Sequence, residues 1–241
     1  MARYRPIASA TAEELRELIS QEFAAGTQLP NEKDLAARLG VSRNTVREAL
    51  AQLVLDGIVE RRWGVGTIVR EPSSQVVLNL LSIKPIRDVI ADAGRQGELS
   101  TATAELVEPP SDLATILRLE SGGKAWQLER LFSIDGAPAI LLQDWVPATL
   151  KGRPVDLEPL HELDVTVLDV LSRQTSVSVA RMEGVLDAVS ASADLAERFR
   201  VPHGQPLVRV HQQALEANGA VVIHTIAHYL GDRVRLSFAR T

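Results

Sequence analysis

The 241-residue sequence contains no cysteine. This absence excludes disulfide bonds, thiol catalysis and cysteine-ligated metal sites, and it is compatible with the cytosol. No apolar run reaches the length of a membrane span, and the basic N-terminal segment at residues 1–10 lacks the apolar core of a secretory signal. We therefore expect a cytoplasmic protein without a membrane partner.

The sequence also lacks the motifs that identify many enzymes. No Ser-His-Asp arrangement, phosphate-binding loop or pair of catalytic acids stands out along the chain. His224 and His228 are four residues apart, but their stretch alternates as a strand, which would separate them by roughly 13 Å. That distance is too long for one shared zinc ion, and His161, His203 and His211 have no partner at a metal-binding spacing. We therefore expect no catalytic residue, no metal and no cofactor.

Net positive charge is missing as well, because the chain carries a formal charge of −5 at pH 7. Residues 1–72 hold ten basic and ten acidic side chains, whereas residues 73–241 hold sixteen and twenty-one. Within residues 31–70 the balance is positive, at seven against five. Any surface that attracts nucleic acid is therefore local, and the acidic remainder would be held away from DNA.

Residues 29–69 have the pattern of two short helices, a tight turn and a two-stranded wing. Asn31 is a suitable N-cap, Gly40 can adopt the left-handed backbone that ends the first helix, and Ser42 can cap the second. Upstream, Thr11 is expected to cap a supporting helix. The second helix has an apolar face, because these residues recur at helical spacing: Val46, Ala49, Leu50, Leu53 and Val54.

Polar residues near the start of the second helix are left on its outer side. In the major groove, arginine can pair bidentately with guanine and asparagine with adenine, so Arg43, Asn44 and Arg47 are candidate base contacts. Thr45 can donate to a phosphate. The glycine-containing wing tip beside Arg61 suits a minor groove. Helix-turn-helix shapes also serve as protein-interaction modules, and spacing alone leaves that alternative open.

A longer set of residues in this stretch repeats a known pattern, roughly LPSE-x-x-LA-x-x-x-x-VSR-x-TVR-x-AL-x-x-L-x-x-x-G-x-GTfV. The matching positions are Leu29-Pro30, Glu32, Leu35-Ala36, Val41-Ser42-Arg43, Thr45-Val46-Arg47, Ala49-Leu50, Leu53, Gly57, Gly64, Gly66-Thr67 and Val69. At this spacing they resemble the winged helix-turn-helix of the GntR family of bacterial transcription regulators.

Two positions depart from that pattern, since Asn31 stands where serine is usual and Lys33 where arginine is common. Glu32 matches, and we interpret it as a capping or helix-dipole charge rather than a base contact. The resemblance implies that the DNA-binding residues are Lys33, Arg43, Asn44, Thr45, Arg47, Gly64 and Gly66.

The second half of the chain alternates strands with short helices. Asp135-Gly136 and Asn218-Gly219 each separate two alternating stretches, as hairpin turns do, and one strand is expected over residues 221–239. Directly joined hairpins with helices between pairs of strands predict an α+β domain around an antiparallel sheet. The expected organisation is a winged helix-turn-helix domain at residues 1–71, a linker at 72–84 and a second domain at 85–241.

Several short motifs occur in this half in a fixed order. They are Glu129-Arg130-Leu131, Asp135-Gly136-x-Pro138, Trp145-x-Pro147, Glu183, residues 191–207, Asn218-Gly219 and Tyr229-x-Gly231-Asp232-Arg233. In this order they are similar to the UTRA domain, the effector-sensing module of the HutC-type branch of GntR regulators. The resemblance implies a sheet of chorismate-lyase-like fold, a small-molecule pocket, and a homodimer formed largely by this half.

Arg130 is the main candidate for effector contact. It is expected on a strand beside the apolar Phe132, and a charge among apolar neighbours needs a partner, either an anionic ligand or a carboxylate such as Glu183. Phe132 and Leu142 stand where family regulators of phosphorylated sugars often carry polar ligand contacts, which weakens the case for a phosphosugar. With the candidates added by family position, the expected effector-binding residues are Ser100, Thr101, Arg130, Glu183 and Tyr229.

Together these features predict a homodimeric transcription regulator, in particular a repressor, that binds a palindromic operator in double-stranded DNA. A small-molecule effector in the second half would modulate that binding. Two alternatives stay open. The second half could be a lyase-like enzyme fused to a DNA-binding head, because a fold does not fix a function. The chain could also bind DNA independently of any effector.

Overall fold

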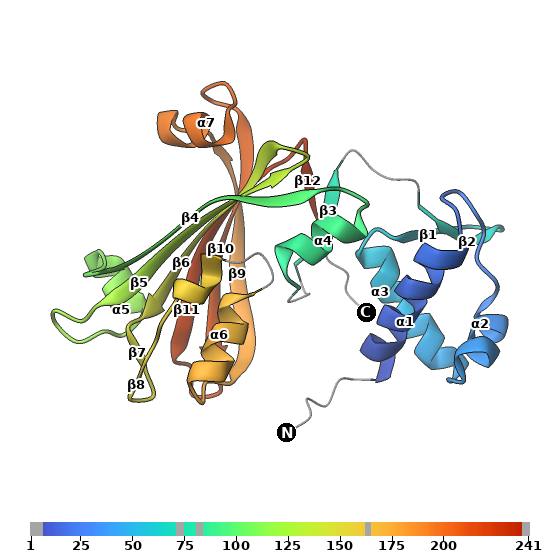
Figure 1. The fold of residues 1–241 in the computed structure, drawn as a ribbon, viewed down its shortest axis with the longest axis horizontal. Coiled ribbons are helices and arrows are strands. Elements are labelled where there is room, and N and C mark those ends of the chain that lie inside the picture. The colour runs from blue at the N-terminus through green and yellow to red at the C-terminus, as the bar shows by residue number, and fades with distance from the viewer. Residues whose placement is uncertain (1–6, 71–74, 81–83, 162–164, 238–241) are drawn as a thin grey trace. The chain divides into compact units, whose positions relative to one another are not determined.

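The computed structural model describes residues 7–70, 75–80, 84–161 and 165–237, and the chain divides into two compact units (Figure 1). The first unit comprises residues 1–83 together with two short returning segments, residues 92–94 and 235–241. The second unit comprises residues 84–91 and 95–234. Each unit is built around its own apolar clusters.

Three helices build the first unit, and capping residues fix where two of them begin. The Asn31 side chain accepts two hydrogen bonds of 3.0 Å from backbone N–H groups in the first turn that follows it. The Ser42 hydroxyl accepts one from the Thr45 N–H at 3.1 Å, and Gly40, with φ +66°, ends the middle helix in the left-handed conformation. These caps are the ones the sequence predicted. The helices are α1 (Ile7–Glu22), α2 (Glu32–Leu39) and α3 (Arg43–Leu55).

Helix α1 begins earlier than the sequence predicted. We expected Thr11 to cap it, but the helix begins at Ile7, and Thr11 lies inside it with 3% of its surface exposed. Ala8 and Ala10 favour helical backbone, so the helix continues N-terminal to the expected cap. The buried face is unaffected, since Leu15 still points inward.

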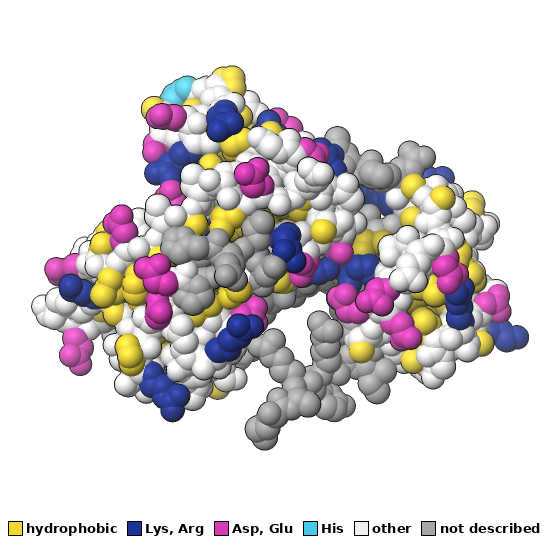
Figure 2. All heavy atoms as spheres, in the orientation of Figure 1, with side chains coloured by type: hydrophobic (Ala, Val, Ile, Leu, Met, Phe, Trp, Pro, Cys, Tyr) yellow, Lys and Arg dark blue, Asp and Glu magenta, His cyan; other side chains and the backbone are white. Residues whose placement is uncertain are grey.

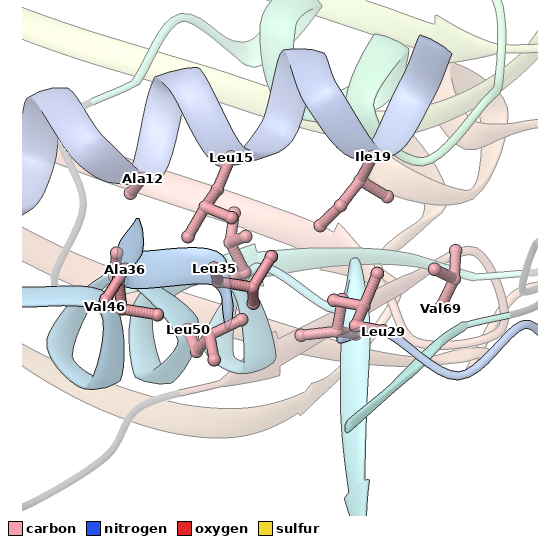
Figure 3. Packing of buried hydrophobic residues seen from close by; sticks show 12 residues of the cluster. Ala12, Leu15, Ile19, Leu29, Leu35, Ala36, Val46, Leu50 and Val69 are labelled. Carbon is pink, nitrogen blue, oxygen red and sulfur yellow. The ribbon is translucent and has the colours of Figure 1, made fainter. Parts of the chain in front are cut away.

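The core of the first unit lies between α1 and the α2–α3 pair (Figure 3). Leu15 of α1, Leu35 of α2 and Leu50 of α3 meet there and are 0%, 0% and 1% exposed. Burial of each such side chain stabilises the fold by roughly 2 kcal/mol. This packing fixes the rotation of α3, so that its apolar residues face inward and Arg43 and Arg47 remain exposed.

A two-stranded wing follows α3 and consists of β1 (Val59–Arg62) and β2 (Gly66–Val69). The strands are antiparallel, with Arg62 opposite Gly66 at the tip. Gln28, just before α2, forms a β-bridge with Ile68 of β2. The wing is therefore attached to the three-helix core through the segment that leads into α2.

A second small sheet joins distant parts of the sequence in the first unit. Strand β3 (Val76–Asn79) pairs with β12 (Val234–Ser237). The Leu80 N–H donates to the Ser237 carbonyl, and the Ser237 hydroxyl donates to the carbonyl of Leu55, the last residue of α3; both distances are 2.9 Å. The end of the recognition helix is thus held by a residue near the C-terminus.

This pairing changes two expectations from the sequence. Residues 76–79 lie in the expected linker at 72–84 but form a strand, because the apolar Val76 and Leu78 become buried there. The single strand expected over 221–239 is two strands separated by a turn at residues 231–233. Residues 235–237 consequently cluster with the first unit, although we expected residues 85–241 to form one domain.

The second unit is built on a six-stranded sheet with the order β4-β5-β6-β11-β10-β9, in which every described neighbouring pair is antiparallel. Within the described residues, no helix of the chain has both the length and the apolar character that crossing a membrane requires. The elements of this unit are α4 (Ile86–Asp92), β4 (Gly97–Val107), α5 (Ser111–Ile116), β5 (Ala125–Ile134), β6 (Ala137–Pro147), β7 (Thr149–Leu150), β8 (Arg153–Pro154), η1 (Glu158–His161), α6 (Val167–Gln174), β9 (Val179–Ser190), α7 (Ala193–Phe199), β10 (Pro206–Glu216) and β11 (Val221–Leu230).

Tight hairpins connect the strands at the two turns that the sequence indicated. Asp135 and Gly136, with φ of +49° and +78°, join β5 to β6, and positive φ at both positions suits a type I′ turn. Gly219, with φ +78°, lies in the turn between β10 and β11. The predicted α+β fold with an antiparallel sheet is confirmed.

The register assigns each central side chain of the sheet to one of two faces, because directly paired residues project to the same side. Arg130 pairs with Leu142, which pairs with Ala227, and we call their side the Arg130 face. His228 pairs with Leu141, one position further along each strand, and we call the opposite side the His228 face. Functional side chains on different faces cannot line one pocket without crossing the sheet.

Helices cover parts of both faces (Figure 1). On the Arg130 face, Leu171 of α6 packs in one cluster with Leu128 and Val146. On the His228 face, Phe199 of α7 packs with Leu141, and α5 covers the other end of the strands through the cluster around Trp145. The central parts of both faces carry polar side chains.

Candidate functional sites

Helix α3 presents polar residues at its exposed N-terminal end. Arg43, Asn44 and Arg47 are exposed, and Thr45 is half-buried. The Asn44 amide donates to a carboxylate oxygen of Glu48 at 2.8 Å, whereas the Thr45 hydroxyl lies 2.8 Å from the hydroxyl of the capping Ser42. The cap therefore orders the same turn that carries the candidate base contacts.

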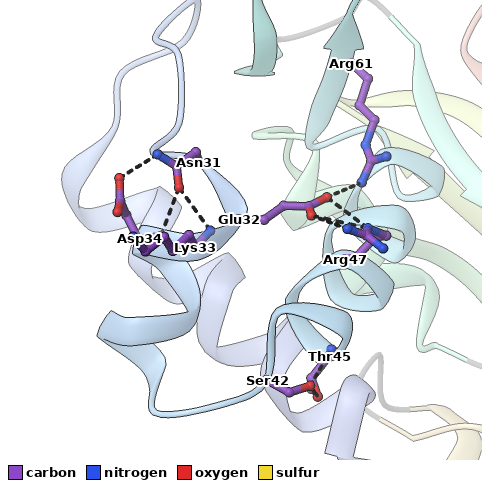
Figure 4. Close-up of polar contacts among 8 residues, drawn as sticks. All are labelled: Asn31, Glu32, Lys33, Asp34, Ser42, Thr45, Arg47 and Arg61. Carbon is purple, nitrogen blue, oxygen red and sulfur yellow. Dashed lines mark hydrogen bonds and ion pairs between the residues drawn. The ribbon is translucent and has the colours of Figure 1, made fainter.

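Glu32 connects the three parts of this surface (Figure 4). Its carboxylate accepts hydrogen bonds from Arg47 Nε and Nη2 of α3, the shortest of 2.9 Å, and lies 3.4 Å from Arg61 Nη2 of the wing. The hydrogen bonds from Arg47 hold the pKa of Glu32 below its usual value. We interpreted Glu32 from the sequence as a capping or dipole charge, and its ion pairs with residues 15 and 29 positions away carry no signal in the local pattern.

The wing tip is a narrow turn that depends on two glycines. The Val65 N–H donates to the Arg62 carbonyl at 3.1 Å, and Gly64 has φ +76° between them. Gly66 has φ +121°, and a Cβ atom there would lie 3.0 Å from the Gln28 amide nitrogen. The glycines are therefore needed for the shape of the tip, independently of any contact that they make with a partner.

Charged side chains of both signs are mixed over the visible surface (Figure 2). Lys33 is exposed on α2, beside the exposed Asp34 and close in sequence to Glu32. All seven residues that the sequence proposed for DNA contact thus lie on α2, α3 or the wing of the first unit. The Glu32 ion pairs bring one of them, Arg47, together with the wing residue Arg61.

The second site centres on a buried ion pair in the sheet. Arg130 Nη2 donates to Asp144 Oδ2 at 3.0 Å, and the Thr225 hydroxyl donates to Asp144 Oδ1 at 2.6 Å. The side chains of Arg130 and Asp144 are only 8% and 5% exposed. The Arg130 guanidinium also lies over the Phe132 ring, 5.7 Å from its centre. Among the described residues, the buried Arg130 Nε has no hydrogen-bond partner.

Tyr229 lies on the same face as this pair, because it is paired with Ile140, two residues before Leu142. Burial, reinforced by the negative charge of Asp144, raises the pKa of the Tyr229 hydroxyl. The Arg130 face therefore combines Arg130, Asp144, Thr225 and Tyr229 with the apolar Phe132 and Leu142.

The other expected effector residues do not join this group. Glu183 pairs across the sheet with Gln213 and so lies on the His228 face, where it forms an exposed ion pair with Arg181 at 2.5 Å. The carboxylate partner of Arg130 is Asp144, which corrects our suggestion of Glu183. The sequence reasoning overlooked Asp144, although its place one strand away from Arg130 follows from the register of the β5–β6 hairpin.

Ser100 and Thr101 lie at a β-bulge in β4. The Ser100 hydroxyl is 2.5 Å from the Ser133 hydroxyl, and Thr101 pairs with Leu131, which places Thr101 on the His228 face. Of the five expected effector residues, the structure thus brings together Arg130 and Tyr229.

Three histidines lie on the His228 face. His224 and His228 are 4% and 7% exposed, and the His211 and His224 rings are 6.2 Å apart. Burial lowers the pKa of His228 to about 4, with a further contribution from Arg209, and burial also lowers the pKa of His224. Within the described part of the chain, no group of three or more suitable side chains could hold a metal ion.

A winged helix-turn-helix combined with an antiparallel sheet that holds a central polar cluster defines a two-part DNA-binding regulator. The family described as bacterial regulatory proteins, gntR family, matches residues 7–69, and the UTRA domain matches residues 92–235. The chain therefore belongs to the GntR family of transcription regulators and carries a UTRA domain, as HutC-type members do. Effector binding by the UTRA domain is typical of that family.

Two relatives span most of the chain. The HTH-type transcriptional repressor NagR of Bacillus subtilis is 25% identical over 229 residues, which cover 95% of this chain and 92% of that protein. The probable transcriptional regulator PhnF of Escherichia coli is 31% identical over 209 residues, which cover 86% and 82%.

Solved structures share the fold over nearly the whole chain. The crystal structure of PhnF from Mycobacterium smegmatis superposes with a TM-score of 0.58 at 22% identity and covers 96% of this chain and 99% of that one. The possible transcriptional regulator YydK of Bacillus subtilis superposes with a TM-score of 0.63 at 16% identity and covers 98% and 100%.

Proposed function

We propose that this regulator is a cytoplasmic repressor that binds a palindromic operator as a homodimer, with one half-site per subunit. The observation that carries the proposal is the exposed N-terminal end of α3, where Arg43, Asn44 and Arg47 stand beside the wing. Its geometry suits a helix whose first turns enter the major groove. The relatives named as repressors support the sign of regulation.

The first test is selection of bound fragments from the source genome by the purified protein. Enrichment of a palindrome is expected, and its position relative to neighbouring genes would identify the regulated operon. Arg43→Ala and Arg47→Ala should each weaken binding to the enriched duplex about 10- to 100-fold if these residues read bases. Unchanged affinity in both variants would remove them from the readout, and enrichment of unrelated fragments would contradict a specific operator.

The proposed homodimer is supported by the edge strand β9. It is the last strand of the described sheet, it is twelve residues long, and it exposes Met182, Val185 and Leu186. A long apolar edge is a surface that another chain can cover. Sedimentation should therefore show a dimer, which Val185→Lys should weaken, whereas Leu106→Lys on the opposite edge strand β4 should not. A monomer at micromolar concentration would contradict the proposal.

We further propose that the effector binds on the Arg130 face, in contact with Arg130 and Tyr229. The unpartnered, buried Nε of Arg130 supports this, because a buried donor without an acceptor is costly. Asp144 already neutralises the guanidinium, and Phe132 and Leu142 are apolar. These neighbours favour an effector that offers a hydrogen-bond acceptor without the full charge of a phosphate.

Thermal unfolding with a panel of metabolites tests this assignment. Neutral or zwitterionic compounds should raise the melting temperature more than sugar phosphates do. Tyr229→Phe should reduce the shift, and His203→Gln, an exposed change elsewhere, should not. We also propose that bound compounds are not turned over, as the names of the relatives as regulators suggest, so each stabilising compound should be recovered unchanged after incubation.

A further inference from the structure

Trp63, at the tip of the wing, has an unusual position for a tryptophan. Its relative exposure is 103%, and the nearby Val65 is 49% exposed. The two other tryptophans have protein neighbours, since Trp126 donates its indole N–H to the Val155 carbonyl at 2.7 Å and Trp145 is 8% exposed. Because an exposed indole leaves a large apolar surface in water, a bound state that covers it is favoured.

The backbone below Trp63 is ordered by several contacts. The Arg62–Val65 hydrogen bond closes the turn, and Gly64 supplies the positive φ that the third position of a type II turn requires. The Gln28 amide donates to the Val65 carbonyl and braces the tip against the segment before α2. The indole is thus presented on a short, braced hairpin.

The charges around Trp63 indicate what it meets. Arg61 and Arg62 precede it, and their side chains are 50% and 62% exposed. Through Glu32, Arg61 is tied to Arg47 of α3, so the wing is held next to the helix that would enter the major groove. A cationic stem with an apolar tip fits the minor groove beside that site, where phosphates line the rims and sugars form the walls.

We propose that the Trp63 indole enters the minor groove of the operator edge-on, with Val65 against a sugar wall, and that it makes the regulator sensitive to the minor-groove surface at that position. The inference rests on the proposed DNA binding and adds a specificity-determining contact to it. Apolar side chains that enter the minor groove are a known means of reading its shape. The minor groove is narrow, so a flat ring is admitted where a bulkier group is not.

Affinity measurements with the enriched duplex test the contact. Trp63→Ala should weaken binding about tenfold, whereas Trp63→Phe, which keeps a flat ring, should retain most of the affinity. Leu106→Ala is the matched control, because it removes an exposed apolar side chain on β4 of the second unit. It should leave DNA affinity unchanged.

Base substitution locates the contact in the groove. An inosine–cytosine pair presents the same major-groove edge as a guanine–cytosine pair but lacks the amino group of guanine in the minor groove. Inosine at the base pairs under the wing should change the affinity of the wild-type protein severalfold, and that change should vanish in Trp63→Ala. Inosine under α3 should affect both proteins equally.

Fluorescence supplies a readout that does not depend on affinity. Without DNA, acrylamide should quench Trp63 freely, and saturation with the duplex should protect it. The protection should be absent from Trp63→Phe, which retains Trp126 and Trp145. If Trp63 is already protected in the free protein, its partner is a protein surface and the proposal is wrong.

The outcomes separate this inference from the proposed function. A wild-type protein that enriches no fragment contradicts operator binding itself, and with it the wing contact. A wild-type protein that binds its operator while Trp63→Ala binds equally well contradicts only the wing contact.

Discussion

Two arginine–carboxylate pairs, one in each unit, have the same chemistry in opposite surroundings. Arg47 and Glu32 lie on the surface, with side chains 53% and 24% exposed, whereas Arg130 and Asp144 are 8% and 5% exposed. Water competes for the first pair, so exchanging one partner for another costs little. The second pair is shielded, and loss of one partner leaves a buried charge.

This difference separates two uses of arginine. Arg47 can release Glu32 and bind DNA, because the carboxylate only holds the guanidinium in place until a stronger partner arrives. Arg130 cannot leave Asp144 without a large loss of stability, so a ligand on the Arg130 face must add to the pair rather than replace it. The buried pair therefore shapes a site, and the exposed pair takes part in binding.

The largest expected effect comes from breaking the buried pair. Arg130→Ala should lower the free energy of unfolding by about 3 kcal/mol, because Asp144 would remain buried without its cation. Urea unfolding of the full chain measures the change. The double variant Arg130→Met with Asp144→Leu should recover much of the loss, since it removes both charges. A loss below about 1 kcal/mol in the single variant would show that the pair behaves like a surface pair.

The buried histidines extend the comparison to acid pH. His228 has a pKa of about 4 in the folded protein, below the usual 6.5, because burial disfavours its charged form. Between these values the unfolded chain binds a proton that the native protein does not bind, so stability increases with pH. The contribution is complete above pH 6.5 and is lost as the pH falls toward 4.

We expect this loss to reach about 2 kcal/mol. Urea unfolding at several pH values between 7 and 4 should show a shallower decline for His228→Gln than for the wild type. The exposed His203→Gln should decline like the wild type. Parallel curves for all three proteins would mean that His228 is protonated alike in the folded and unfolded states.

The smallest effect concerns the exposed pair. Glu32→Gln removes a negative charge from the surface that faces DNA and frees Arg47 and Arg61. Non-specific DNA affinity should increase about threefold, with a smaller gain for the operator, so that discrimination falls. Glu60→Gln is the control, because it removes an equal charge beside Arg62 but leaves Arg47 paired. Equal changes in both variants would attribute the effect to net charge alone.

Local signals in the sequence were sufficient for much of the fold. Asn31, Gly40 and Ser42 mark helix ends, and Asp135-Gly136 marks a hairpin, because capping and turn preferences depend on neighbouring residues. The pairing of β3 with β12 could not be derived in that way, since it joins residues more than 150 positions apart.

The candidate sites divide in the same manner. The exposed residues of α3 follow from helical periodicity once the apolar face is known. The partner of Arg130 depends on strand register, and a shift of one residue moves a side chain to the other face. This is why Glu183 was suggested and Asp144 was overlooked.

The pairing of β3 with β12 also bears on how interchangeable the parts of such regulators are. A head cut from the gene at residue 80 would lack β12, would leave β3 with an open edge prone to aggregation, and would lose the Ser237 hydrogen bond at the end of α3. A functional graft of this head onto another sensor would have to carry residues 234–237 with it. The DNA-binding unit is thus encoded in separate parts of the gene, and recombination at the apparent boundary would divide it.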